Sequence, residues 1–140
     1  MDLEDMKAVS RRMLGLWAGT STDHPREFIA ESYVNHQEPF AEDGSSDIGL
    51  DRWLELVGHH RVAFPDCTVE ILTQLAEADK VATRWRFSGT NTGPYRGKAP
   101  TGRAVSWTGV EIDVFEDGKI VESFVDWDMH RQLEQLGHLG

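Results

Sequence analysis

The sequence of 140 residues has a single cysteine, five prolines and no long hydrophobic run. One cysteine, Cys67, excludes an internal disulfide and a zinc site built from cysteines. No apolar stretch approaches the ~20 residues that a membrane-spanning helix needs. The segment MDLEDMKAVSRRM lacks the basic-then-apolar order of a secretory signal peptide. These absences predict a soluble, cytoplasmic protein.

Positive charge is also scarce. The sequence has 14 Lys and Arg against 24 Asp and Glu, a formal net charge of -10. This balance opposes the phosphate contacts that drive nucleic-acid binding and the attraction to anionic lipid. We therefore expect neither nucleic acid nor a membrane as a partner.

Motifs for metals and nucleotides are missing as well. The sequence has no HExxH motif, phosphate-binding loop or dinucleotide-binding glycine pattern. His59 and His60 are adjacent in a predicted helix, where they diverge by ~100° and cannot chelate one ion from one face. We predict no metal and no organic cofactor.

The length fits one domain over residues 1–140, with helices in the first half and strands in the second. In the first half we predict three helices, which run from Met6 to Trp17, from a cap at Thr22 and Asp23 through Ile29, and from after Ser46 and Asp47 to before Pro65. Strand-like segments follow at 68–75 and 81–87, then a hairpin around Asp117-Gly118, a strong two-residue turn signal. A final helix, MHRQLEQL, is predicted at 129–136. The fold class is α+β, with an antiparallel sheet that has the helices on one side.

The last hairpin has one mixed face and one uniform face. If Asp117-Gly118 is a two-residue loop, Glu116 faces Lys119, and opposed residues share a face. The mixed face then holds Trp107, Glu111, Asp113, Phe115, Ile120, Glu122, Phe124, Asp126 and Asp128. The uniform face holds Thr108, Val110, Ile112, Val114, Val121, Ser123, Val125 and Trp127. An apolar face with carboxylates suits a pocket under the helices, whereas the uniform face suits the interface of a homodimer.

Several motifs together resemble the SnoaL-like polyketide cyclases. They are AFPD at 63–66, RWRFSGTNTG at 84–93, PTGR at 100–103, DGKIVE at 117–122 and a closing D-x8-G with QLG. The resemblance extends over nearly the whole chain. It implies the cone-shaped α+β superfamily of nuclear transport factor 2, scytalone dehydratase and ketosteroid isomerase, in which a curved sheet and helices enclose an apolar cavity.

The resemblance also implies an acid–base aspartate shortly before the last helix. Asp128 matches that position best, and Asp126 lies on the same predicted face. Burial in an apolar cavity favours the protonated form of a carboxyl group, which can then act as general acid or base near neutral pH. Family members often have histidine where this sequence has Glu111, so Glu111 is the third candidate for proton transfer. The alternatives are an N-cap role for Asp128 and a solvated sheet edge for the other two.

Candidate substrate-binding side chains are mainly aromatic. They are His36, Trp53, Trp85, Asn91, Trp107 and Phe124. Asn91 stands in GTNTG where family members often have histidine. The alternative for His36 is a packing or surface position, and for the aromatic residues it is the core.

Three functions are consistent with these features. The first is a cofactor-free acid–base enzyme that catalyses aldol-type cyclisation or isomerisation of a hydrophobic, polyketide-like substrate. The second is a SnoaL-type hydroxylase of a polyketide. The third is a non-catalytic module for small-molecule binding or dimerisation, and a cavity without a buried carboxylate would favour it.

Overall fold

The computed structural model describes residues 1–20, 24–37 and 47–139. Its elements are α1 (Leu3–Ala18), the 3-10 helix η1 (Pro25–Glu27), β1 (Ile29–His36), β2 (Asp47–Gly49), α2 (Leu50–Ala63), β3 (Thr68–Glu77), β4 (Lys80–Thr90), β5 (Ala104–Glu116), β6 (Lys119–Trp127) and α3 (Met129–Leu136). The predicted α+β class is confirmed. No helix within the described residues is both long and apolar enough to cross a membrane.

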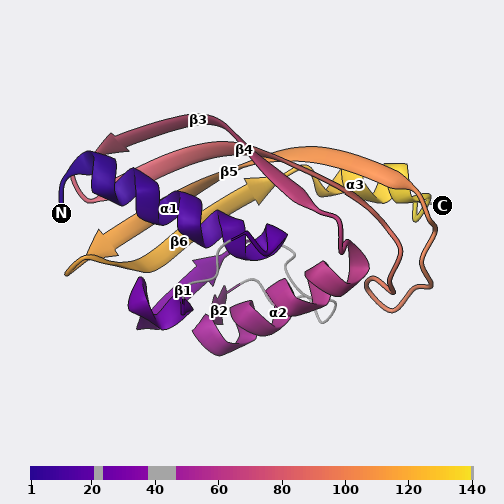
Figure 1. Ribbon diagram of the computed structural model, residues 1–140, viewed down its shortest axis with the longest axis horizontal. Helices are drawn as coiled ribbons and strands as arrows, with labels where there is room; N and C mark the ends of the chain where they lie inside the picture. The colour runs from indigo at the N-terminus through magenta and orange to yellow at the C-terminus, as the bar shows by residue number, and fades with distance from the viewer. Residues whose placement is uncertain (21–23, 38–46, 140) are drawn as a thin grey trace.

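The six strands form one curved sheet in the order β2-β1-β6-β5-β4-β3. Neighbouring strands are antiparallel except β1 and β6, which run parallel. Strands β3 to β6 arch over α1 and α2, so the helices cover the concave side of the sheet (Figure 1). The opposite, convex side is the outer face.

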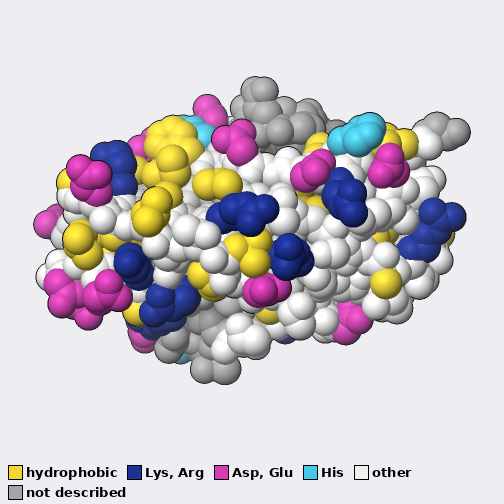
Figure 2. Space-filling model, turned by 90° about the horizontal axis from the view of Figure 1, so that it is seen from above, with side chains coloured by type: hydrophobic (Ala, Val, Ile, Leu, Met, Phe, Trp, Pro, Cys, Tyr) yellow, Lys and Arg dark blue, Asp and Glu magenta, His cyan; other side chains and the backbone are white. Residues whose placement is uncertain are grey.

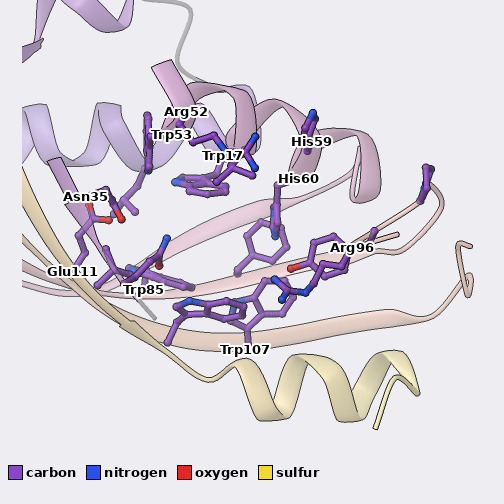
Figure 3. A pocket seen from close by; sticks show the side chains of 18 residues that line it. Trp17, Asn35, Arg52, Trp53, His59, His60, Trp85, Arg96, Trp107 and Glu111 are labelled. Carbon is purple, nitrogen blue, oxygen red and sulfur yellow. The ribbon is translucent and has the colours of Figure 1, made fainter. Parts of the chain in front are cut away.

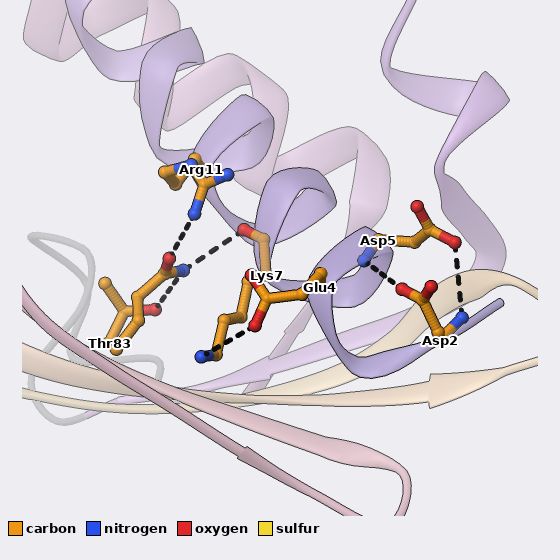
Figure 4. A network of polar contacts seen from close by, with 7 residues as sticks. Asp2, Glu4, Asp5, Lys7, Arg11 and Thr83 are labelled. Carbon is orange, nitrogen blue, oxygen red and sulfur yellow. Dashed lines mark hydrogen bonds and ion pairs between the residues drawn. The ribbon is translucent and has the colours of Figure 1, made fainter.

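Helix α1 is fixed at its ends and along its length. Asp2 caps it, since the backbone N–H of Asp5 donates to Asp2 Oδ1 at 2.8 Å and the N–H of Asp2 donates to Asp5 Oδ2 at 3.2 Å (Figure 4). Gln74 of β3 then joins the helix to the sheet. It accepts from Arg11 Nη1 at 2.6 Å and donates from Nε2 to Lys7 O at 3.1 Å. The helix therefore has a defined position on the sheet.

The predicted second helix is wrong. Among the described residues 24–28, only the three residues of η1 are helical, and the chain then enters β1 at Ile29. The cap predicted at Thr22 and Asp23 lies outside the described residues. The prediction relied on Pro25 in a first helical turn and on Phe28 and Ile29 as its buried side. In the structure, Ile29 and Tyr33 are buried as residues of strand β1, which pairs with β6. The partner strand lies about 90 residues later in the chain, so the local sequence does not show this pairing. Tertiary contacts, rather than local propensity, determine the strand conformation of this segment.

The helix predicted over 47–65 is confirmed as α2, which begins at Leu50 and ends at Ala63. Leu50, Trp53 and Val57 form its buried stripe. The face of α2 that carries this stripe therefore packs toward the sheet, and Trp53 lies inside the molecule.

The hairpin of β5 and β6 has the predicted turn but a different register. Asp117 and Gly118 both have positive φ, at 52° and 80°, and Glu116 pairs with Lys119. The register shifts next to the turn, because Phe115 pairs with Ile120 whereas Val114 pairs with Glu122. Val121 is thus an extra residue, a β-bulge, and every β6 side chain beyond it lies on the face opposite to the predicted one.

Candidate active site

A cavity of about 280 Å³ lies between the two helices α1 and α2 and the concave face of the sheet (Figure 3). Its lining comes from α1, β1, α2, β4, β5, β6 and the loop between β4 and β5. All five tryptophans of the chain line it, namely Trp17, Trp53, Trp85, Trp107 and Trp127. Ligand pockets are mostly apolar with a few polar groups, and this lining has that character.

The aromatic lining packs in defined geometries. Phe87 and Trp107 stack with ring centroids 4.4 Å apart and an interplanar angle of 25°. Trp17 meets Trp53 edge-on, with centroids 5.7 Å apart and an angle of 89°. Such walls favour a flat, apolar ligand, which can stack on one ring and meet others with its edge.

Trp85 depends on a glycine in the neighbouring strand. Gly109 pairs with Trp85 across β4 and β5, and a Cβ atom on Gly109 would lie 2.3 Å from Trp85 Cζ2. Only a glycine therefore lets this indole lie against the sheet. The position of Trp85 in turn keeps the cavity open.

Glu111 is the one acidic side chain among the described residues that line the cavity. It lies on β5, is 3 % exposed, and pairs with Thr83 and Val125 in the neighbouring strands. Burial, followed by the charge of Asp113 and a hydrogen bond with it, raises the pKa of Glu111 well above its usual 4.5. Glu111 is therefore a buried carboxyl group that favours its protonated form.

Asp113 lies behind Glu111 and is fully buried. Burial also raises the pKa of Asp113, whereas hydrogen bonds from Glu111, Ser123 and Ser10 lower it. The Ser123 hydroxyl donates to Asp113 Oδ1 at 2.6 Å. A hydrogen bond between two carboxyl groups needs one shared proton, and these influences place it on Glu111 and the negative charge on Asp113.

Two polar residues of β1 extend this network. Asn35 Nδ2 donates to the Tyr33 hydroxyl at 2.7 Å. Burial and the nearby charges of Glu111 and Asp113 raise the pKa of Tyr33 well above 10, so it stays a neutral phenol. Asn35 also lines the cavity, and its Oδ1 has no hydrogen-bond partner within the described parts of the chain. Neither residue's part in this network was expected from the sequence.

His60 is a further polar group of the cavity that was not among the predicted site residues. Burial lowers the pKa of His60 to about 3, so its imidazole is neutral at physiological pH. The ring lines the cavity, and its Nδ1 is buried without a hydrogen-bond partner among the described residues. It lies between 4.7 and 5.8 Å, centroid to centroid, from the rings of Trp17, Phe64, Phe87, Tyr95 and Trp107. Apart from Phe64, which follows four residues later, these neighbours come from distant segments of the chain, so the local sequence does not indicate this site.

The predicted positions of Asp126 and Asp128 are wrong. Both side chains are exposed, and neither residue lines the cavity. Because of the bulge at Val121, Asp126 lies opposite Val110 on the outer face. Asp128 caps α3 by accepting the backbone N–H of Arg131 at 3.0 Å, which is the alternative considered from the sequence. Of the three candidates for proton transfer, only Glu111, on the strand before the bulge, lines the cavity.

Three predicted substrate-binding residues also lie outside the cavity. Phe124 is 43 % exposed on the outer face, and His36 stacks on it with ring centroids 4.7 Å apart. Asn91 is fully buried but uses its side chain to hold the β4–β5 loop, donating to Ala63 O and Gly93 O. The bulge explains Phe124, and the missed strand β1 explains His36.

The other three predicted substrate-binding residues, Trp53, Trp85 and Trp107, do line the cavity. Within residues 1–20, 24–37 and 47–139, no three or more His, Cys, Asp and Glu side chains form a group that could hold a metal ion. Whether a cofactor binds stays a prediction.

Comparison with known proteins agrees with this architecture. The family model of the SnoaL-like polyketide cyclases matches residues 7–136. AclR from Streptomyces galilaeus, described as a candidate hydroxylase, is 30% identical, with a TM-score of 0.83 over 99% of this chain and 84% of its own. IdmH from Streptomyces antibioticus, described as a candidate polyketide cyclase, is 29% identical, with a TM-score of 0.77 over 92% of this chain and 98% of its own. TsrD from Streptomyces laurentii shares the fold at 21% identity, with a TM-score of 0.84 over 99% of each chain. No functionally curated protein matches the sequence.

Proposed function

The chain belongs to the SnoaL-like polyketide cyclase family, and we propose that it is a cofactor-free acid–base enzyme for a flat, hydrophobic, polyketide-like substrate. One observation carries the proposal: a carboxyl group, Glu111, lies buried in an otherwise aromatic cavity with its pKa raised well above the usual range. General acid–base catalysis is most effective when the pKa of the group approaches the working pH.

In the proposed reaction, Glu111 is the proton carrier. Its carboxylate form removes a proton from the carbon α to a carbonyl group, which leaves an enolate, and its acid form then protonates the enolate or the new alkoxide. The charge of Asp113 raises the proton affinity of Glu111, and Ser123 holds Asp113 in place. Asp113 is therefore a positioning residue. Attack of the enolate carbon on a second carbonyl group of the substrate gives cyclisation, whereas return of the proton to a different carbon of the enolate gives isomerisation.

The proposal is tested by following hydrogen exchange at the α-carbon in D2O by NMR, with aryl methyl ketones and aryl β-keto esters as substrates. We expect the wild type to accelerate exchange and Glu111→Gln to reduce that acceleration by about 10²–10⁴-fold. Asp128→Asn is the matched control, because it removes a carboxylate but keeps the cap, and it should exchange like the wild type. Full exchange activity in Glu111→Gln would exclude Glu111 as the proton carrier.

The similarity to AclR favours a second candidate function, hydroxylation of the same class of substrate. A hydroxylase consumes O2 and electrons, whereas enolisation proceeds equally well under argon. If product formation requires O2, hydroxylation rather than acid–base catalysis is the function of this chain. Ligand binding with neither exchange nor O2 consumption would select the third candidate, a binding module.

We also propose a homodimer through the outer face of the sheet. The bulge changes the residues expected there, because Val125 is buried and Phe124 takes its place beside Val110 and Ile112, which are 41 % and 38 % exposed. Figure 2 looks onto this face and shows hydrophobic side chains among Lys and Arg. We expect light scattering to give the mass of a dimer for the wild type and of a monomer for Ile112→Glu, with Val62→Glu as the exposed control on α2. A wild-type monomer at micromolar concentration would contradict this.

A further inference from the structure

The charge of the cavity lining is opposite to the charge of the chain. Asp and Glu outnumber Lys and Arg by ten, yet the described lining holds one acid, Glu111, and two arginines, Arg52 and Arg96. Glu111 and Arg96 lie at opposite ends of the cavity (Figure 3), so Glu111 does not neutralise the charge of Arg96. A positively charged lining in a strongly negative chain attracts an anionic ligand.

We propose that the substrate of this cavity carries a carboxylate and that Arg96 binds it at the end of the cavity opposite Glu111. Figure 3 shows Glu111 beside Asn35 at one end and Arg96 reaching in from the β4–β5 loop at the other, with Trp107 on the floor beneath it. This inference rests on the proposed function, since it assigns the substrate class of the same cavity.

Arg96 is a better anion ligand than Arg52. The Arg52 guanidinium already forms an ion pair with Glu55 at 2.9 Å, one turn along α2. Arg96 is half-buried at the cavity and has no ion pair within the described residues. A guanidinium fits a carboxylate with two parallel hydrogen bonds, so an unpaired arginine at a cavity is suited to such a ligand.

The backbone of Arg96 also favours a role beyond the turn itself. Tyr95 and Lys98 exchange two backbone hydrogen bonds of 3.0 Å, and the residues between them, Arg96 and Gly97, have φ of 52° and 77°. This is a type I′ turn, whose first central position favours Asn, Asp or Gly over a long side chain. An arginine here is disfavoured by the turn, and residues held in such a conformation are concentrated at ligand-binding and catalytic sites.

The turn is held firmly enough to position a ligand group. The Tyr95 hydroxyl and the Gln132 amide of α3 hydrogen-bond to each other at 2.8 and 3.1 Å. At the base of the loop, Asn91 Oδ1 accepts the backbone N–H of Thr101 at 2.8 Å. Arg96 therefore extends from a loop that is fixed both at its base and near its tip, so the backbone that carries Arg96 needs little ordering when a ligand binds.

A substrate bound in this way has a defined orientation. Its carboxylate stays near Arg96, its aromatic rings lie among the tryptophans, and its carbonyl end reaches Glu111 (Figure 3). The substrate class is thus a flat aromatic carboxylic acid that has a ketone at the far end.

The test is equilibrium binding of two unreactive probes of the same shape, anthraquinone-2-carboxylate and its neutral carboxamide, at pH 7. Quenching of intrinsic fluorescence reports occupancy directly, because all five tryptophans line the cavity. We expect the wild type to bind the carboxylate about five- to tenfold more tightly than the carboxamide, and added salt to narrow that ratio. Arg96→Asn should reduce the ratio to about one and leave the melting temperature unchanged or higher, because Asn suits the positive φ.

Lys98→Gln is the matched control, since it removes the same charge from an exposed side chain of the same turn. It should keep the wild-type ratio. The proposal is overturned if the wild type does not prefer the carboxylate, if Arg96→Asn keeps the preference, or if Lys98→Gln loses it equally. None of these outcomes affects hydrogen exchange on neutral ketones, so a failure here is distinct from a failure of the acid–base function.

Discussion

Replacing Glu111 with glutamine should stabilise the folded protein at neutral pH while it removes proton transfer. Burial raises the pKa of Glu111 above its unfolded value of about 4.5, so the folded state holds this proton more tightly than the unfolded state does. The stability that this group contributes is fully present below pH 4.5 and is lost as the pH rises through the folded pKa. Glutamine has no such loss, so the advantage of the variant should grow with pH.

The size of the effect follows from linkage. Each unit by which the folded pKa exceeds the unfolded pKa lowers the free energy of unfolding by about 1.4 kcal/mol once the pH is above both values. In a chain of this length, 1 kcal/mol corresponds to about 2–5 °C in melting temperature. In Glu111→Gln, the amide of the introduced side chain can also donate a hydrogen bond to Asp113, in place of the proton that the two carboxyl groups share in the wild type.

Urea denaturation of both proteins between pH 4.5 and 8.5 measures this difference. Glu116→Gln is the control, because Glu116 is an exposed glutamate of the same strand, and its stability should stay parallel to the wild type. A gap between Glu111→Gln and wild type that is the same at every pH, or a variant that is less stable at pH 8.5, would refute the buried, protonated state of Glu111.

Three further predictions concern other parts of the structure. Asp128→Ala should lower the free energy of unfolding by about 0.5–2 kcal/mol through loss of the α3 cap, whereas Asp128→Asn should be nearly neutral in thermal melts. Gly109→Ala should cost about 1–3 kcal/mol by overpacking and should weaken binding of an anthraquinone probe, because the new Cβ pushes Trp85 into the cavity; unchanged probe affinity would contradict this. The hydrogen bond to Asp47 raises the pKa of His36, so its small contribution to stability is present below pH 6.5 and fades as the pH rises through the folded value; urea melts of wild type and His36→Gln at pH 5.5 and 8.5 should converge at the higher pH.

The sequence located Glu111 but misplaced the two aspartates, and both outcomes have the same physical basis. On β5 the buried side chains alternate without interruption from Val105 to Phe115, so period-2 reasoning is valid along the whole strand. On β6 the turn was predicted correctly, but the bulge at Val121 inverts the alternation beyond it. A bulge changes the pairing of two strands without a distinctive residue type, so the position of Asp126 and Asp128 required the structure.

Features that depend on distant contacts were the hardest to predict. The apolar stripe of α2 repeats within one helix and was sufficient to find it, whereas β1 owes its form to pairing with β6. His60 became prominent only when rings from three other segments enclosed it. The proton-sharing partner Asp113 was assigned to the correct face, but its effect on Glu111 depends on burial that only the packed molecule shows.

The fixed base of the β4–β5 loop has a consequence for how the sequence and length of the segment 94–100 can vary. The Asn91 side chain hydrogen-bonds to Ala63 and Gly93 and also to Thr101. These bonds hold the start and the end of the loop together independently of the residues between them. Closing a somewhat longer or shorter segment changes the loop entropy only slightly, by about 0.6 kcal/mol per doubling of length. We therefore expect that the segment 94–100 of this chain can be replaced as a unit, which would change the side chain at position 96 while the sheet and Glu111 stay in place.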